Sequence, residues 1–358
     1  MTTRTSPTRR TRTSWAGALA LTAATALALT GCVAGEDAQG DAAGAGTDSD
    51  AAAGSSTSGE WSTDTLNIDF ATYNPLSLIV KDQGFIEEAL GDDVEVTWTQ
   101  SAGSNKANEL LRAGAVDVAS TAGSAALLAR SNGSPIHTID IYSQPEWSAL
   151  VVPEDSDITD VDDLEGKTIA ATTGTDPYFF LLQALDAAGL SASDVTVQNL
   201  QHADGRAALE NGSVDAWAGL DPIMAASQAE AGTELLYRNV DFNTYGMLNA
   251  REDFLEKSPE LAQQVVDAYA QARTWALANS ADFAALYAEA AQLSPEVAAL
   301  VLERTRLDGD LAPGDAQRTV LTGIIPLMVQ IGGASSEDVV SKALDGLLEP
   351  SFADEASA

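Results

Sequence analysis

The pattern of hydrophobic and polar positions along the chain predicts the same structural unit twice. Residues 65–70 have the apolar enrichment of a strand, a polar turn follows, and a helix is expected over 76–83. Residues 167–171 repeat the strand, and a second polar turn leads into a helix over 178–188. In both copies Asn or Asp precedes a proline at the first helical position, which is typical of a capped helix start. The two prolines, Pro75 and Pro177, are 102 residues apart.

A second pair of segments supports the duplication. Residues 109–118 and 206–216 each read as a helix that ends at a glycine and is followed by a short strand. The two glycines, Gly114 and Gly212, are 98 residues apart, close to the offset of the prolines. Two similar α/β lobes with parallel sheets are the simplest explanation. The alternative is that turn and capping motifs common in α/β proteins recur here by chance.

Five loops of these two units are candidates for a ligand site. Parallel sheets hold their ligands at the carboxyl ends of the strands, and helix starts with free N–H groups suit small oxyanions. The loops are rich in hydroxyls, glycines and amides. The candidate ligand residues in them are Tyr73, Asn74, Ser104, Asn105, Thr121, Ser124, Thr173, Thr175 and Asp176. For any one of them taken alone, the alternative is a cap that serves only its own helix.

Further candidates carry aromatic or ionisable side chains. Tyr73, Trp147 and Trp217 are expected either in an apolar wall of the site or in the core of a lobe. Asp221 either meets a cationic group of the ligand or caps the helix that begins at Pro222. Two alternatives remain for the segment 201–206. In the structural one, Asp204 caps a helix and Arg206 is solvated or paired. In the functional one, His202 or Arg206 faces the ligand cleft between the two lobes. Lys106 either adds a positive charge at its helix start or is exposed.

The first 62 residues are expected to form an export signal and a tether. Four arginines without an acid precede an apolar stretch from Trp15 to Leu29, which is too short to span a bilayer, and the sequence Leu29-Thr-Gly-Cys32 follows. This arrangement resembles a bacterial lipoprotein signal over 1–31, which implies cleavage before Cys32 and acylation of its thiol. A plain secretory signal with a chance cysteine is the alternative. Residues 32–62 are small and polar, so they are expected to form a flexible tether.

Composition excludes several classes of function. The chain of 358 residues has a net charge of −35, and loss of its first 31 residues removes four basic and no acidic residues, leaving −39. Such a charge repels nucleic acid and anionic lipid. Cys32 is the only cysteine, and the two histidines, His137 and His202, are far apart in sequence. The sequence therefore predicts no disulfide, no metal site, no cofactor and no catalytic triad.

The motifs together resemble one family. The segments 69–75, 103–106, 120–123, 132–135, 174–177, 201–206 and 217–222 are similar to those of the aliphatic sulfonate binding proteins of ABC importers, within the wider sulfonate, nitrate and taurine group. The resemblance implies a two-lobed periplasmic-binding-protein fold of the second type, with crossovers near 149–153 and 243–248. The first lobe would comprise 63–150 plus 244–358, and the second 151–243.

Beyond Arg251 the chain is expected to be helical. Apolar residues at three and four spacing predict helices over 259–278, 281–291, 295–307 and 317–331. These helices are expected to pack against the first lobe, with Trp275 and Phe283 in the core rather than in the site.

The resemblance implies a protein that is lipid-anchored on the outer face of the cell membrane. It would be the monomeric substrate-binding component of an ABC importer that serves sulfur acquisition, with a membrane permease as partner. A sulfonate has three acceptor oxygens and no donor, so uncharged hydroxyls and amides suffice to hold it. Nitrate, bicarbonate, taurine or a thiamine-pyrimidine precursor is the alternative ligand. An enzyme of the pyrimidine-precursor type would use a cysteine-rich stretch and histidines as reactants, and the sequence offers neither, with one cysteine and two separated histidines. A surface adhesin would show an array of repeats or a large exposed apolar face, and the sequence indicates neither.

Overall fold

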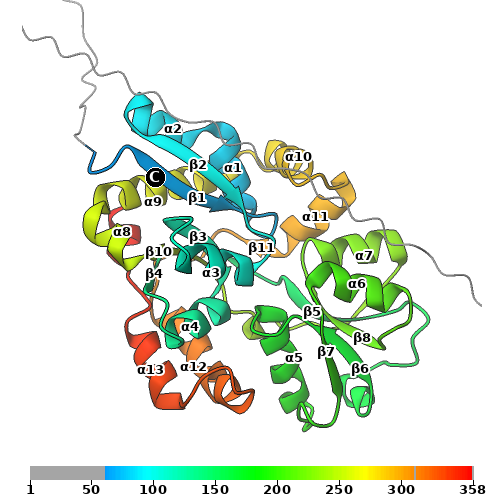
Figure 1. Ribbon diagram of the computed structural model, residues 1–358. Coiled ribbons are helices and arrows are strands. Elements are labelled where there is room, and N and C mark those ends of the chain that lie inside the picture. The colour runs from blue at the N-terminus through cyan, green and yellow to red at the C-terminus, as the bar shows by residue number, and fades with distance from the viewer. Residues whose placement is uncertain (1–60, 310–311, 357–358) are drawn as a thin grey trace, which may run out of the picture. The chain divides into compact units, whose positions relative to one another are not determined.

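The computed structural model describes residues 61–309 and 312–356, which contain two β-sheets with helices packed on them (Figure 1). The first sheet has the strand order β11-β4-β10-β3-β1-β2, and the second has the order β7-β6-β8-β5-β9. The strands of the first sheet are β1 (Thr65–Phe70), β2 (Glu95–Gln100), β3 (Val118–Ala122), β4 (Ile136–Pro145), β10 (Gly246–Arg251) and β11 (Thr305–Arg306). Those of the second are β5 (Ser148–Val152), β6 (Thr168–Ala171), β7 (Thr196–Asn199), β8 (Ala216–Leu220) and β9 (Glu234–Tyr237).

The two sheets share one arrangement of strands. In the first, β1 pairs in parallel with β2 and β3, and β10 lies antiparallel beside β3. In the second, β6 pairs in parallel with β7 and β8, and β5 lies antiparallel beside β8. The predicted duplication is confirmed at the level of strand order, and the predicted α/β class with it.

The chain crosses between the sheets twice. It leaves the first sheet when β4 ends at Pro145 and enters the second when β5 begins at Ser148, so the crossing lies at residues 146–147. It returns through residues 243–245 to β10. The return falls within the expected segment 243–248. The first crossing precedes the expected segment 149–153, because those residues already pair with β8 and β9.

The expected helices are present, most of them with small shifts at their ends. The helix expected over 295–307 is the exception, because it ends at Glu303 and Thr305–Arg306 form strand β11 instead. Asn74 caps α1 by accepting a hydrogen bond from the Ser77 amide at 3.3 Å, as the Asn-Pro motif predicts. At the equivalent position of α5 the cap residue is Thr175, and Asp176 uses its side chain elsewhere. The helices preceding β10 are α1 (Pro75–Gln83), α2 (Phe85–Leu90), α3 (Ser104–Arg112), α4 (Gly123–Ser131), α5 (Asp176–Ala187), α6 (His202–Glu210) and α7 (Ile223–Ala231).

The helices after β10 are α8 (Glu252–Lys257), α9 (Pro259–Ala278), α10 (Ser280–Ala290), α11 (Pro295–Glu303), α12 (Asp315–Gln330), α13 (Glu337–Asp345) and α14 (Ser351–Glu355). As expected, α9 packs on α1 and α2, and α12 and α13 pack on α4. Two of them also reach helices of the second sheet, since α11 contacts α7 and α12 contacts α5. No helix within 61–309 and 312–356 combines the length and apolar character needed to cross a membrane.

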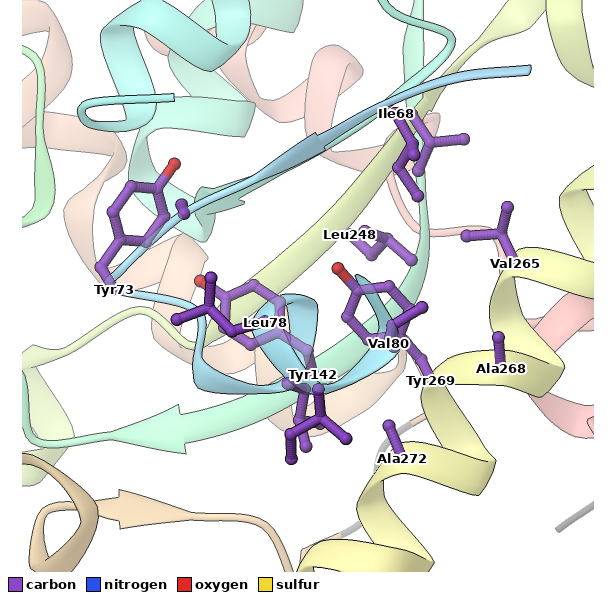
Figure 2. Close-up of a cluster of buried hydrophobic side chains, with 14 of the residues drawn as sticks. Ile68, Tyr73, Leu78, Val80, Tyr142, Leu248, Val265, Ala268, Tyr269 and Ala272 are labelled. Atoms are coloured by element: carbon purple, nitrogen blue, oxygen red, sulfur yellow. The ribbon is translucent and has the colours of Figure 1, made fainter. Parts of the chain in front are cut away.

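Buried apolar side chains fill the space between the first sheet and the helices α1 and α9. Figure 2 shows Ile68 of β1 and Leu248 of β10 near Val265 and Tyr269 of α9, all fully buried. Phe283 of α10 belongs to the same cluster and Trp275 packs against it, as expected. This packing fixes the end of β1, and thereby the loop that follows it.

Candidate functional site

Loops at the carboxyl ends of strands in the two sheets contact each other directly. Asn105, after β2, donates a hydrogen bond from Nδ2 to the carbonyl oxygen of Thr173, after β6, at 3.3 Å. A Cβ placed on Gly103 would lie 3.7 Å from Nε2 of His202, which follows β7. We name the segments 101–105, 122–124, 172–176 and 199–202 the facing loops. Their contacts join the two sheets at the carboxyl ends of their parallel strands, where open α/β sheets generally hold ligands.

A groove opens beside the facing loops. It has a volume of about 360 Å³ and is lined by α3 and α4 of the first sheet and by Gly174 of the second. Its polar lining includes Asn105, Asn108 and Arg112, and Leu128 contributes apolar surface. The groove is therefore a route by which solvent reaches the facing loops from one side.

A buried carboxylate connects the two sheets to both crossings. Asp176, at the start of α5, accepts hydrogen bonds from Ser124 Oγ at 2.8 Å, from Trp147 Nε1 at 2.7 Å and from the Thr244 amide at 3.0 Å, and also from the Thr244 hydroxyl. Trp147 lies in the first crossing and Thr244 in the second. Burial raises the pKa of Asp176 above its ordinary value, and these donors oppose the rise.

The start of α4 is already occupied by internal groups. The Ser124 amide donates to Thr244 Oγ1 at 2.8 Å, and the Gly123 amide donates to the Thr244 carbonyl at 3.1 Å. The Ser124 hydroxyl donates to Asp176. This helix start was expected to bind an external anion, and in the structure the side chain of Asp176 and the Thr244 segment use its donors instead.

Several of the other candidate polar side chains make hydrogen bonds within the protein. Ser104 Oγ accepts from the Ala122 amide at 3.0 Å, and the Thr175 hydroxyl donates to the Thr172 carbonyl at 2.6 Å. Thr121 accepts from Asn249 Nδ2 at 2.8 Å and donates to the Ala122 carbonyl at 2.9 Å. Asn74, besides capping α1, donates to the Tyr269 hydroxyl at 3.1 Å. All the hydrogen bonds just described therefore serve the protein's own structure, which is the alternative to ligand binding for these residues.

Trp217 and Asp221 also take their structural alternatives. Trp217 is fully buried among the apolar residues between the second sheet and its helices α6 and α7. Asp221 accepts from the Ala225 amide at 2.9 Å, as a cap does, and from Arg304 Nη1 at 3.2 Å. Burial raises the pKa of Asp221 to about 6 although Arg304 opposes the rise. The expectation that this carboxylate meets an amine of the ligand loses its basis, because Arg304 fills that role.

Two aromatic side chains meet beside the first crossing. The rings of Tyr73 and Trp147 are 6.1 Å apart and nearly perpendicular. The Tyr73 hydroxyl donates to the Ser120 carbonyl at 2.8 Å, and the Trp147 indole donates to Asp176. Both rings therefore have fixed orientations between the end of β1 and the crossing.

The side chains of Lys106 and Arg206 pair with nearby acids and make no contact between the facing loops. Lys106 is about half exposed and pairs with Glu109 at 3.2 Å. Arg206 pairs with Glu210 at 2.5 Å and with Glu230 at 2.7 Å on the outside of α6. His202 is buried and contacts Thr172, with Nδ1 3.2 Å from its hydroxyl oxygen. Of the ionisable candidates in the segment 201–206, only His202 faces across to the other sheet.

Sequence reasoning missed a group of buried polar side chains near the crossings. The hydroxyls of Tyr142, Ser143 and Ser148 are buried and make no hydrogen bond to the described residues. Tyr142 lies close enough to Trp147 for their rings to be 6.4 Å apart. Asp69, at the end of β1, is fully buried and accepts from the Ser120 amide at 2.8 Å, and burial raises its pKa to about 7. The only sequence signal was the presence of polar residues at the ends of apolar strands.

The residues within 61–309 and 312–356 include no group of three or more histidine, cysteine or acidic side chains placed to hold a metal ion. The site offers hydroxyl, amide, indole and imidazole groups. These groups suit recognition of a polar solute by hydrogen bonds.

Comparison with known proteins agrees with this architecture. Two bacterial relatives bear the name putative aliphatic sulfonates-binding protein. The one from Escherichia coli K12 is 27% identical over 246 residues, which is 68% of this chain and 77% of the relative. The one from Bacillus subtilis 168 is 30% identical over 232 residues, which is 64% of this chain and 70% of the relative.

A solved structure gives the fold. The alkanesulfonate-binding protein SsuA of Xanthomonas axonopodis pv. citri, bound to MOPS, matches with a TM-score of 0.71 at 24% identity, over 78% of this chain and 98% of that chain. The predicted periplasmic-binding-protein fold is thereby confirmed. The family model described as NMT1/THI5 like matches residues 77–282, more than half of the sequence. The doubled strand order and the two crossings agree with this match. The chain therefore belongs to the NMT1/THI5-like family.

Proposed function

We propose that the chain is the extracytoplasmic substrate-binding component of an ABC importer and captures an aliphatic sulfonate between the facing loops. The observation that carries the proposal is the direct contact between loops of the two sheets, made by the hydrogen bond from Asn105 to Thr173. Gly103 also faces His202, closely enough that a Cβ added to Gly103 would lie 3.7 Å from the ring. A solute held there would touch both sheets at once, so its binding would favour their approach. The names of the two bacterial relatives supply the ligand class.

The available donors suit a sulfonate head. Its three oxygens accept hydrogen bonds and it has nothing to donate. The hydroxyls of Tyr142 and Ser148 are buried donors without a partner in the described residues, and an unsatisfied buried donor is costly unless something binds it. We propose that Tyr142 contributes a hydrogen bond to the head, and that Asn105, Thr173 and His202 also contact the ligand.

The remaining candidates divide by what they already contact. Tyr73 and Trp147 form the proposed apolar wall for the organic tail, since their rings lie together beside Tyr142. Six residues whose polar groups are used internally are proposed to position the loops: Asn74, Ser104, Thr121, Ser124, Thr175 and Asp176. Trp217 and Asp221 are not part of the proposed site.

We propose no catalytic step. Thr172 and His202 are neighbours, as a nucleophile and a base would be, but the Thr172 hydroxyl donates to the Leu200 carbonyl at 2.7 Å. Its proton is therefore not directed at the imidazole, which a general base would require. The other histidine, His137, pairs with Glu252 at 3.3 Å on the first sheet.

Attachment to the membrane is proposed through Cys32, which lies outside the described residues. Acylation there would hold the chain on the outer face, where a permease can receive the solute. The proposed signal over 1–31 and tether over 32–62 also lie outside the described residues, apart from Trp61 and Ser62.

Isothermal titration calorimetry tests the ligand class. The purified protein is titrated with ethanesulfonate, taurine, MOPS, nitrate, bicarbonate and an aminopyrimidine, in phosphate because many common buffers are themselves sulfonates. Binding of sulfonates at least tenfold tighter than of the other solutes is expected. Lys106→Met serves as a control that should leave the affinity unchanged, because Lys106 is exposed and paired with Glu109. Preference for nitrate, bicarbonate or the pyrimidine would overturn the proposal.

A further inference from the structure

The hydrogen bonds around His202 define its tautomer. Thr172 Oγ1 lies 2.7 Å from the Leu200 carbonyl oxygen and 3.2 Å from His202 Nδ1. A carbonyl oxygen can only accept, so it takes the single hydroxyl proton of Thr172. His202 Nδ1 must then carry a hydrogen and donate it to Thr172 Oγ1. In the neutral imidazole this leaves Nε2 without a hydrogen.

The bare nitrogen faces the other sheet. A Cβ on Gly103 would lie 3.7 Å from Nε2 and from Cδ2 of His202, so this edge of the ring is turned toward the loop after β2. Nε2 makes no hydrogen bond within the part of the chain that the structure describes. His202 thus turns a ring nitrogen that has no hydrogen-bond partner among the described residues toward the loop after β2.

The surroundings of the imidazole keep it neutral at physiological pH. Burial lowers the pKa of His202 to about 4, and no charged side chain contributes to the shift. Two groups that face the ring are Gly103 and the Thr172 hydroxyl, and neither of them titrates at physiological pH. On its own helix, Asp204 is exposed, and Arg206 is paired with Glu210 and Glu230.

A neutral Nε2 is an acceptor, and so is every oxygen of a sulfonate. The two cannot form a hydrogen bond unless a proton is placed between them. A protonated Nε2 would instead make a charge-assisted hydrogen bond to the sulfonate, and the anion would raise the pKa of the imidazole by stabilising its charged form.

We propose that binding of the sulfonate is coupled to uptake of one proton at His202 Nε2, so that affinity rises as the pH falls. This inference rests on the proposed function. Between the pKa of the imidazole in the free protein and that in the complex, the dissociation constant should increase about tenfold for each unit of pH. Release of the ligand would accordingly release a proton.

Calorimetry measures the coupling directly. Ethanesulfonate is titrated at pH 6 and pH 7 in phosphate, imidazole and Bis-Tris, which all buffer in this range and differ in ionisation enthalpy. The dependence of the observed heat on the buffer gives the number of protons taken up. About one proton is expected at pH 6. His202→Gln supplies a permanent amide donor, so it should bind with no proton uptake and with a flat pH profile.

His137→Gln is the matched control, because His137 is the only other histidine and lies on the first sheet beside Glu252. It should keep the proton uptake of the parent protein. With two histidines in the chain, imidazole nitrogen shifts in NMR can follow each ring, and the His202 signals should move to the protonated form only when ligand is added.

The possible results separate the two proposals. Sulfonate binding without proton uptake, or with the same uptake in His202→Gln as in the parent, would overturn the proton coupling and leave the proposed function standing. Failure of every sulfonate to bind between pH 5 and pH 8 would overturn both.

Discussion

Arg304 Nη1 lies 3.2 Å from both carboxylate oxygens of Asp221, and both side chains are buried. Arg304 follows α11, and Asp221 lies between the end of β8 and the start of α7. Arg304 also donates to Gln228 on α7. The pair therefore attaches the C-terminal helices, which also pack against the first sheet, to the second sheet.

Replacing this carboxylate should cost stability and leave ligand selectivity unchanged. In Asp221→Asn the buried charge of Arg304 loses its partner, which should lower the free energy of unfolding by about 3 to 5 kcal/mol. The affinities for taurine and ethanesulfonate should change equally, because Arg304 already contacts both carboxylate oxygens of Asp221 and leaves no place for an amine of the ligand. Urea denaturation and calorimetry with both ligands check this. The double variant Asp221→Asn with Arg304→Met should recover part of the loss. A selective loss of taurine binding would return Asp221 to the site.

The carboxylate of Asp176 should matter for stability in a way that an exposed acid on the same helix does not. Asp176→Asn turns one acceptor oxygen into a donor among four donor groups, so it should cost about 2 to 4 kcal/mol. Asp186→Asn, at an exposed position of α5, should cost less than about 0.5 kcal/mol. If the denaturation curves of the two variants coincided, the hydrogen-bond account of Asp176 would be wrong.

Two tyrosines separate packing from ligand contact. Tyr142→Phe removes a hydroxyl that has no partner in the described residues, so the ligand-free protein should be as stable as the parent or slightly more stable. Its affinity for ethanesulfonate should fall about tenfold or more, if a hydrogen bond to a charged acceptor is lost. Tyr73→Phe removes the bond to the Ser120 carbonyl and should instead cost about 1 kcal/mol of stability. Unchanged affinity in Tyr142→Phe would exclude that hydroxyl from the site.

The stability contributed by Asp69 should be greatest in acid. Burial raises its pKa from 3.8 to about 7, so between these values the folded state holds a proton that the unfolded state has lost. Its contribution is therefore fully present below pH 4 and declines as the pH rises through 7. Asp69→Asn should remove this decline, by at most about 4 kcal/mol. Free energies of unfolding of both proteins from pH 4 to pH 8 test the sign, and a difference that is constant with pH would contradict it.

The proposed anchor is tested in cells. Cys32→Ser should leave the signal uncleaved or release the protein from the membrane, because the thiol that would carry the lipid is gone. Cell fractionation and metabolic labelling with a fatty acid measure both effects. Retention of the lipid label in the variant would rule out Cys32 as the acylated residue.

The sequence predicted well what depends on neighbours along the chain. The cap at Asn74 needs only Ser77, three residues away, and the amphipathic spacing of 259–278 matches α9 residue for residue. The duplicated strand order follows from the repeated strand, turn and helix motifs. In each of these cases the energetic preference is local, so a short window of sequence contains it.

The partners of the buried acids were not predictable in the same way. Asp176 precedes a proline and reads as a cap, yet its bonds reach Ser124 and Thr244, which are 52 and 68 residues away. Asp221 likewise meets Arg304 at a separation of 83 residues. A carboxylate at a helix start has the same local pattern whether it serves its own amides or distant donors, and only tertiary packing decides between them.

The place of β10 in the first sheet has a consequence for the order of folding. β3 and β4 each pair with β10 and not with one another, so until residues 246–251 arrive the first sheet consists of two separate pieces. The second sheet uses one continuous stretch, from Ser148 to Tyr237, which precedes β10 in the chain. The second sheet can therefore assemble during synthesis or export as a nascent unit, whereas the first must wait for a strand inserted from far downstream, which makes its completion the slower step.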